Sequence, residues 1–315
     1  MNRAIARRRI APAVIVATTA AAVLTGCGDQ TAGGSSSGGT NNGAVSDAPL
    51  FSKLPAEIQK AGVIKVGTDA TYAPMEFKEG DKIVGVDPDI AAALSKQLGV
   101  KFEFAGGTFD TLLTALTTGR TDVVMSSVTD TKARQEGLDD KGQKTGAGVD
   151  FVDYFIAGSV VYVQKGNPQK VRSIEDLCGK ATAVQRGTTF ETVAKTQSKA
   201  CEKAGKPALR IEAFPTDAEA QTRVKAGGAV AGVNDYPVAL HLTRTAGGGN
   251  AFEIVGDQIE AGPFGIAVDK KDTQLRDAIK DALNVIINDG TYKKALDKWG
   301  AGSGAVTSAG INGGS

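Results

Sequence analysis

The stretch from Met125 to Arg134 holds the residues best suited to bind an anionic group, because hydroxyl side chains lead into a single arginine. The hydroxyl side chains are Ser126, Ser127, Thr129 and Thr131. The residues before them, Thr121–Val124, are mostly apolar and β-branched, which predicts a buried strand. Asp130 or Thr131 could then cap a short helix that carries Arg134 in its first turn. Helix-start N–H groups, hydroxyls and a guanidinium together favour binding of a carboxylate.

The place of Arg134 in this helix is itself informative. A helix N-terminus is electropositive, so an arginine in the first turn is mildly unfavourable unless an anion lies between the two. A solvated arginine on a surface helix is the alternative interpretation. The organisation of the rest of the chain favours the carboxylate site.

Two similar halves of the chain are predicted to position this motif, each alternating strands with helices. The first half is predicted to contain strands at 63–67 and 101–104, helices at 87–99 and 108–118, and the strand before the arginine motif. The second is predicted to contain strands at 181–184, 209–211 and 230–233, and helices at 190–204 and 217–226. Asp87 is expected to be the N-cap of its helix, with Pro88 in the first helical position.

Both halves deliver polar residues at the carboxyl ends of strands. In open α/β sheets this edge is where ligands bind, so two such edges facing each other predict a cleft. Apolar segments at 151–163 and 262–268 are expected to cross between the halves and to form a hinge. Helices are expected at 275–290 and 291–299 after the second crossing. The predicted fold class is therefore α/β, with two lobes joined by a two-strand hinge.

Both ends of the chain are predicted to lie outside the lobes. Four arginines precede the apolar run Ile10–Leu24, and small residues follow it, as in a secretory signal. The run of about 15 residues is short of the roughly 20 that span a bilayer. Leu24-Thr-Gly-Cys27 resembles a bacterial lipobox, so residues 1–26 would be removed and Cys27 lipidated. Residues 27–49 and 301–315 are Gly- and Ser-rich, which predicts a flexible tether and a disordered tail.

Composition and charge limit the partners. The chain has 315 residues, of which 41% are hydrophobic and 23% charged, as in an ordinary globular protein. Without residues 1–26 it has 32 basic and 35 acidic residues and no basic stripe, so no nucleic-acid partner is expected. His241 is its one histidine, and no metal or other cofactor is expected. Cys178 and Cys201 remain besides Cys27, and outside the cytoplasm they predict a disulfide rather than two reduced thiols.

The motifs of residues 61–300 together resemble the bacterial extracellular solute-binding proteins of the polar amino-acid class, which serve ABC importers. The matching stretches, in order, are Gly67–Pro74, Gly85–Ile90, Phe109–Leu113, Asp122–Arg134, Arg186–Thr189, Asn234-Asp235 and Asp289–Lys294. Val86 stands where the family often has Phe, Pro88 interrupts its Asp-x-Asp, and residues 135–150 look inserted. The resemblance implies a periplasmic-binding-protein-like fold, with lobe 1 at 50–159 and 263–300 and lobe 2 at 160–262.

The resemblance also implies roles for individual residues. Arg134 would bind the α-carboxylate of an amino acid, helped by the Thr129 hydroxyl and by N–H groups near Thr189. Asp235, from the other lobe, would pair with the α-ammonium group. The predicted ligand-binding set is Asp69, Tyr72, Phe109, Ser126, Ser127, Thr129, Arg134, Gln185, Thr188, Thr189 and Asp235.

Several of these residues also have structural interpretations. Tyr72 and Phe109 would enclose the ligand side chain, although Phe109 also fits the apolar face of its helix. Asp69 favours a cationic or amide side chain, or else it caps the turn that follows it. Asp235 could be an ordinary turn aspartate before Pro237. Glu76 is interpreted as structural.

The predicted function is that of an extracytoplasmic, membrane-anchored, monomeric lipoprotein that captures a polar amino acid and delivers it to an ABC permease and its ATPase. It would touch the membrane through the lipid on Cys27 only. Two alternatives remain at this stage. One is an enzyme resembling the cyclohexadienyl dehydratases, which share this fold but need a general acid in the cleft. The other is a ligand sensor for a membrane receptor.

Overall fold

The computed structural model describes residues 47–139 and 141–315. The predicted signal peptide, the lipid on Cys27 and most of the predicted tether lie outside the described residues.

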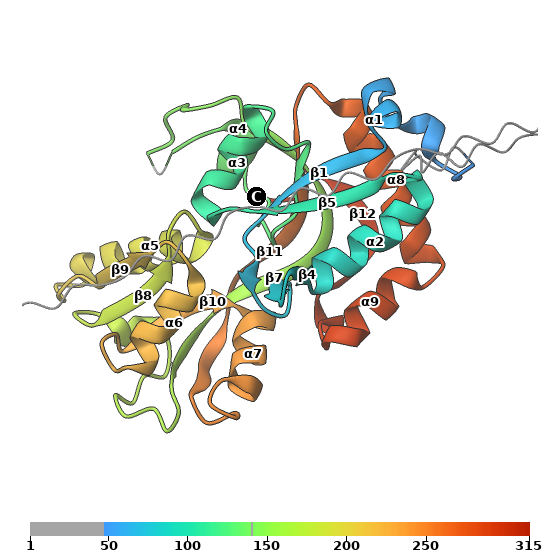
Figure 1. The fold of residues 1–315 in the computed structure, drawn as a ribbon. Helices are drawn as coiled ribbons and strands as arrows, with labels where there is room; N and C mark the ends of the chain where they lie inside the picture. Colours follow the sequence, from blue (N-terminus) through green and yellow to red (C-terminus); the bar gives the residue numbers. More distant parts are fainter. Residues whose placement is uncertain (1–46, 140) are drawn as a thin grey trace, which may run out of the picture. The chain divides into compact units, whose positions relative to one another are not determined.

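Two long antiparallel strands join two α/β lobes. β7 (Val149–Gln164) and β11 (Phe252–Asp269) pair with each other along most of their length. At one end β11 pairs with β6 (Val123–Val124), and at the other end β7 pairs with β10 (Ala231–Asp235). The strand order β5-β1-β6-β11-β7-β10-β8-β9 therefore continues through both lobes (Figure 1). These strands are the two crossing segments that the sequence predicted.

The pairing of β7 with β11 is irregular midway between the lobes. The register shifts between Val255 and Ile259 and again between Ile259 and Gly262. Gly256 and Glu260 have positive φ angles of 72° and 47°. Such bulges bend and twist a strand pair, so we expect the two lobes to hinge at this segment.

The first lobe is built on a parallel sheet in which β1 lies between β5 and β6. The strands of this parallel sheet are β1 (Val63–Thr68), β5 (Lys101–Gly106) and β6. A separate small sheet consists of β2 (Thr71–Tyr72), β3 (Glu76–Glu79) and β4 (Lys82–Val84). Its helices are η1 (Phe51–Lys53), α1 (Ala56–Ala61), α2 (Val86–Leu98), α3 (Phe109–Thr117), α4 (Lys132–Glu136), α8 (Thr273–Asn288) and α9 (Thr291–Trp299). Leu275, Ile279 and Leu283 of α8 are buried, as their spacing predicted.

The second lobe repeats the parallel arrangement, with β8 between β9 and β10. Its elements are η2 (Ile174–Leu177), β8 (Ala181–Gln185), α5 (Thr189–Lys203), β9 (Arg210–Phe214), α6 (Asp217–Lys225), β10 and α7 (Tyr236–Thr245). Across 47–139 and 141–315, no helix is long and apolar enough to span a membrane.

The expected cap of α2 is wrong. The helix begins at Val86, with Gly85 as its N-cap, so Asp87 lies within the first turn. Asp87 is fully buried and accepts hydrogen bonds from the Tyr154 hydroxyl (2.7 Å) and the Ser127 N–H (3.2 Å). Local sequence favoured a cap, but two partners distant in the chain require the carboxylate inside the lobe.

The expected disorder of residues 301–315 is also wrong. After η3 (Gly302–Gly304), β12 (Ala305–Ile311) pairs with β7. On this edge of β7, β10 pairs only with residues 159–163. The earlier part of the same edge is therefore open, and β12 pairs with it at Val152, Asp153 and Phe155. A backbone edge can be paired whatever the side chains, so a Gly- and Ser-rich segment without apolar periodicity still forms a strand here. At Gly304 a Cβ would lie 2.1 Å from the Phe155 ring, so the close fit requires glycine.

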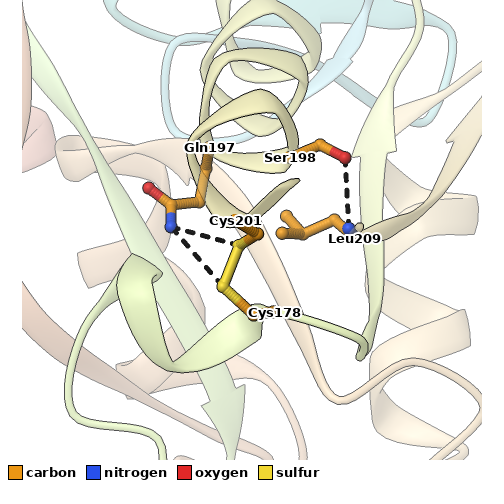
Figure 2. Close-up of a disulfide and its surroundings, with 5 residues drawn as sticks. All are labelled: Cys178, Gln197, Ser198, Cys201 and Leu209. Atoms are coloured by element: carbon orange, nitrogen blue, oxygen red, sulfur yellow. Dashed lines mark hydrogen bonds between the residues drawn. A yellow bond between two sulfur atoms is a disulfide. The ribbon is translucent and has the colours of Figure 1, made fainter. Parts of the chain in front are cut away.

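The predicted disulfide is present between Cys178, which follows η2, and Cys201 on α5. Figure 2 shows the Gln197 side chain directed at the two sulfur atoms, and Ser198 accepting a hydrogen bond from the Leu209 N–H (3.1 Å). The disulfide connects the segment after η2 to helix α5 of the second lobe. In the chain-entropy model a loop of this size stabilises by about 3 kcal/mol.

Candidate functional site

One cavity between the two lobes is lined by all eleven residues of the predicted ligand-binding set. Glu76 and Phe190 complete its lining. The lobes touch across it, so the space left inside is only about 10 Å³, roughly enough for one water molecule. A ligand larger than a water molecule could therefore enter only if the lobes separated or the contacts between them were displaced.

Arg134 is held on α4 as its predicted cap requires. The Thr131 hydroxyl is the N-cap and accepts from the Arg134 N–H (3.2 Å). The guanidinium donates to the Thr129 carbonyl (2.7 Å) and, across the cleft, to the Gly187 carbonyl (3.1 Å). It also lies 5.4 Å from the centre of the Phe109 ring. Burial lowers the pKa of Arg134 to about 10, so it stays charged at neutral pH.

The opposite wall comes from the turn between β8 and α5. The Thr188 hydroxyl caps α5 by accepting from the Glu191 N–H (3.3 Å), and it donates to the Gln185 carbonyl (2.6 Å). The Thr189 hydroxyl lies 3.4 Å from the Thr129 hydroxyl of the first lobe. Gly187 has a φ of 75°, and a Cβ there would lie 3.0 Å from the Asp110 Cβ, so glycine allows both the turn and the approach of the lobes.

Asp235 lies at the carboxyl end of β10 and is almost fully buried. Its carboxylate accepts from the Tyr72 hydroxyl of the other lobe (2.8 Å). Although it is the N-cap residue of α7, its side chain makes no capping hydrogen bond, so helix capping does not explain it. Burial, with a further contribution from the charge of Asp217, raises the pKa of Asp235 to about 7, against the lowering effects of the Tyr72 hydrogen bond and the charge of Arg134.

Asp69 has both of the environments that the sequence left open. Its carboxylate accepts from the Thr71 hydroxyl (2.8 Å), as a turn cap would, and from the Gln185 amide of the other lobe (2.7 Å). It also lines the cavity. Burial raises the pKa of Asp69 from its ordinary value.

At one wall of the cavity, two buried carboxylates and two serines form a connected network. The Ser126 hydroxyl donates to Glu76 (2.9 Å), as does the Ser127 hydroxyl (3.2 Å). The Ser127 N–H reaches Asp87, and the φ of Ser127 is 49°, a strained value for a residue with a side chain. Burial, followed by the charge of Asp87, raises the pKa of Glu76 well above its ordinary value. Glu76 thus takes part in a buried hydrogen-bond network and also lines the cavity.

Comparison with known proteins places this chain in a family. The family model of bacterial extracellular solute-binding proteins, family 3, matches residues 64–302. The chain belongs to this family. The arginine-binding protein ArgT of Corynebacterium glutamicum is 30% identical over 261 residues, which cover 82% of this chain and 81% of ArgT.

Two solved structures of ancestral proteins resemble this solute-binding protein. The first is an ancestral arginine-binding protein bound to arginine, 38% identical, with a TM-score of 0.65 over 76% of this chain and 98% of that one. The second is an ancestral amino acid-binding protein described as a precursor of cyclohexadienyl dehydratase, 38% identical, with a TM-score of 0.66 over 77% and 97%. Because even this second protein is a binder, the comparisons support a binding protein and not an enzyme.

The cleft of this solute-binding protein is lined by more acidic than basic side chains. Three carboxylates line it (Asp69, Glu76 and Asp235) against one cation, Arg134. No group of three His, Cys, Asp or Glu side chains within 47–139 and 141–315 is arranged to hold a metal ion. The sequence analysis did not predict Phe190. It expected ligand-binding residues at the carboxyl ends of strands, whereas Phe190 lies inside α5.

Proposed function

We propose that this solute-binding protein captures an α-amino acid with a cationic side chain, such as arginine, in the cleft between its lobes. The excess of carboxylates over cations in the cavity lining carries the proposal. If the α-carboxylate of the ligand neutralises Arg134 and its ammonium group pairs with Asp235, Asp69 is left to pair with a second positive charge. The names of ArgT and of the ancestral arginine-binding protein support the same ligand class.

The remaining lining residues would fix the geometry of the ligand. The Thr129 hydroxyl and the N–H groups at the start of α5 would complete the carboxylate site around Arg134. Tyr72 and Phe109 would enclose the aliphatic part of the side chain, and Ser126, Ser127, Gln185 and Thr188 would bound its polar end. Because Arg134 and Asp235 come from different lobes, the site is complete only when the lobes close about the hinge.

An amide side chain is the second candidate. Asp69 and Gln185 could accept from and donate to a glutamine side chain without a second positive charge. The two candidates differ in charge, so a direct comparison of arginine with glutamine separates them.

Family membership implies delivery of the ligand to an ABC permease and its ATPase. We propose that the chain does so as a monomer outside the cytoplasm, held at the membrane by a lipid on Cys27. Labelling of expressing cells with radioactive palmitate, with Cys27→Ser as control, tests the anchor. Equal labelling of both proteins would contradict it.

A thermal-shift screen of the Cys27→Ser protein against single amino acids tests the ligand class. Ligand at 100 times Kd adds about 2.7 kcal/mol to the unfolding free energy, which corresponds to several degrees at roughly 2–4 °C per kcal/mol for a protein of this size. We expect this shift with arginine or lysine, not with glutamate, and not in Arg134→Ala. A shift with glutamate, or none with a cationic amino acid, would contradict the proposal.

A further inference from the structure

Asp217, at the start of α6, is a buried carboxylate that lines no part of the cavity and is not needed to cap its helix. Only 1% of its surface is exposed. The capping of α6 is already complete, because Thr216 and Glu219 form a reciprocal capping box. One oxygen of Asp217 accepts from the side-chain amides of Gln221 (2.6 Å) and Asn234 (2.9 Å), while its other oxygen has no hydrogen-bond partner. A buried charge with half of its bonding capacity unused requires an explanation.

The contact with Asn234 determines which way the Asn234 amide points. A carboxylate can only accept hydrogen bonds, so it requires the NH₂ end of the amide on its side. The Asn234 oxygen then faces the cleft. There it accepts from the Tyr72 hydroxyl of the first lobe (2.5 Å) and from the Asp235 N–H (2.8 Å).

The Tyr72 hydroxyl has a single proton, which lies between two acceptors of the second lobe, the Asn234 oxygen and the Asp235 carboxylate. If the Asn234 amide were reversed, its NH₂ end would meet the Asp235 N–H, donor against donor. The Tyr72 hydroxyl would then have only the Asp235 carboxylate to donate to, and the backbone N–H of Asp235 would lose its partner. The orientation of one buried amide thus determines one contact between the lobes and the hydrogen bond that holds the backbone of Asp235.

We infer that Asp217 is a positioning residue of the ligand site: by fixing the Asn234 amide, it holds Tyr72 and Asp235 in the geometry that closes the lobes around the ligand. The inference rests on the proposed function for the identity of the ligand. Asp217 would thus affect the affinity for the ligand, although Asp217 itself does not line the cavity. Burial raises the pKa of Asp217 to about 6, and the charge of Asp69 adds to this rise.

Two substitutions separate orientation from charge. Asp217→Asn keeps an oxygen that can accept from Gln221 and Asn234 but removes the charge. Asp217→Leu removes the acceptor and leaves the buried Asn234 NH₂ group unpaired, which is expected to weaken binding about 10-fold or more. Glu219→Gln removes a carboxylate charge from the same helix without touching Asn234, and serves as the matched control.

A double-mutant cycle measured by calorimetry on the Cys27→Ser protein, with arginine as the probe, tests the inference. We expect Asp217→Leu and Tyr72→Phe each to lose about 10-fold. Because both act through the same hydrogen-bond chain, the double variant should lose about the same and not the roughly 100-fold product. Asp217→Asn should stay within about fivefold of the parent protein. Losses that multiply, or an Asp217→Leu protein that binds as the parent does, would overturn the inference.

Folding and ligand class are controlled separately. Melting without ligand shows whether Asp217→Leu folds, and Asp217→Ser, which cannot reach Asn234, replaces it if it does not. In ¹⁵N NMR the Asn234 NH₂ protons should exchange slowly in the parent and in Asp217→Asn, and fast in Asp217→Leu or Asp217→Ser, with no ligand present. Failure of the parent to bind arginine would contradict the proposed function, whereas slow exchange in all variants would contradict the role of Asp217.

Discussion

Replacing Asp235 by Asn should weaken arginine binding strongly at alkaline pH and much less at acid pH. The buried carboxylate would pair with the ligand ammonium group, and an amide of similar size cannot. Removing one partner of a buried, hydrogen-bonded charge pair costs about 2–5 kcal/mol, or roughly 30- to several-thousand-fold in Kd. This is the loss that we expect at pH 8.

The pH dependence follows from the raised pKa of Asp235. Because burial raises this pKa to about 7, the carboxylate is mostly ionised at pH 8 and mostly protonated at pH 5. A protonated carboxyl must lose its proton before it can pair with an ammonium group. Two pH units below the pKa, this lowers the affinity of the parent protein by about 100-fold, at 1.4 kcal/mol per unit. The Asn side chain does not titrate, so between pH 8 and pH 5 the ratio of the two Kd values should fall towards one, by up to about 100-fold.

Calorimetric titrations with arginine at pH 5, 6, 7 and 8 measure this ratio. The other buried carboxylates are present in both proteins, so the ratio isolates the contribution of Asp235. Repeating the titrations in buffers of different ionisation enthalpy counts protons, and the parent protein should release about half a proton more than the variant at pH 7. A ratio that is the same at pH 5 and pH 8, or equal binding by both proteins, would refute the pairing of Asp235 with the ligand.

The remaining predictions concern selectivity and stability. Asp69→Asn should reduce the preference for arginine over glutamine by about 10-fold or more, measured as the ratio of the two Kd values, because it removes the second negative charge; an unchanged ratio would contradict that role. The Cys178→Ala/Cys201→Ala double variant should lose about 3 kcal/mol of unfolding free energy in denaturant titration, and a loss below about 1 kcal/mol would contradict it. Deletion of residues 305–315 should lower Tm, because it exposes the edge of β7, whereas an unchanged melting curve would show that β12 adds no stability. Without ligand, the raised pKa of Asp235 stabilises the folded state. This contribution is complete at a pH below 3.8, the ordinary pKa of an aspartate, and it is lost as the pH rises through about 7. The Asp235→Asn protein should therefore gain stability over the parent between pH 5 and pH 8 in denaturant titrations, and a constant difference would contradict it.

The sequence alone predicted the main alternating strands and helices of both lobes, and most of the residues that line the cleft. The spacing of Leu275, Ile279 and Leu283 predicted the buried face of α8, because apolar periodicity acts within one element. The Thr131 cap of α4 depends on contacts within three residues. All eleven predicted ligand-binding residues line one cavity because polar residues at the carboxyl ends of parallel strands gather at the same edge of a sheet. Their contacts with a ligand remain predictions.

Only the tertiary structure decided features that depend on partners far apart in the chain. Asp87 reads locally as a helix cap, but Tyr154 and Ser127 hold it inside the lobe. Residues 305–311 have the composition of a disordered tail, but an open stretch of the β7 edge pairs with their backbone. The link from Asp217 through Asn234 to Tyr72 joins three elements from two lobes. Local sequence records which hydrogen bonds a side chain can make, whereas folding selects the partner by bringing distant groups together in a space closed to water.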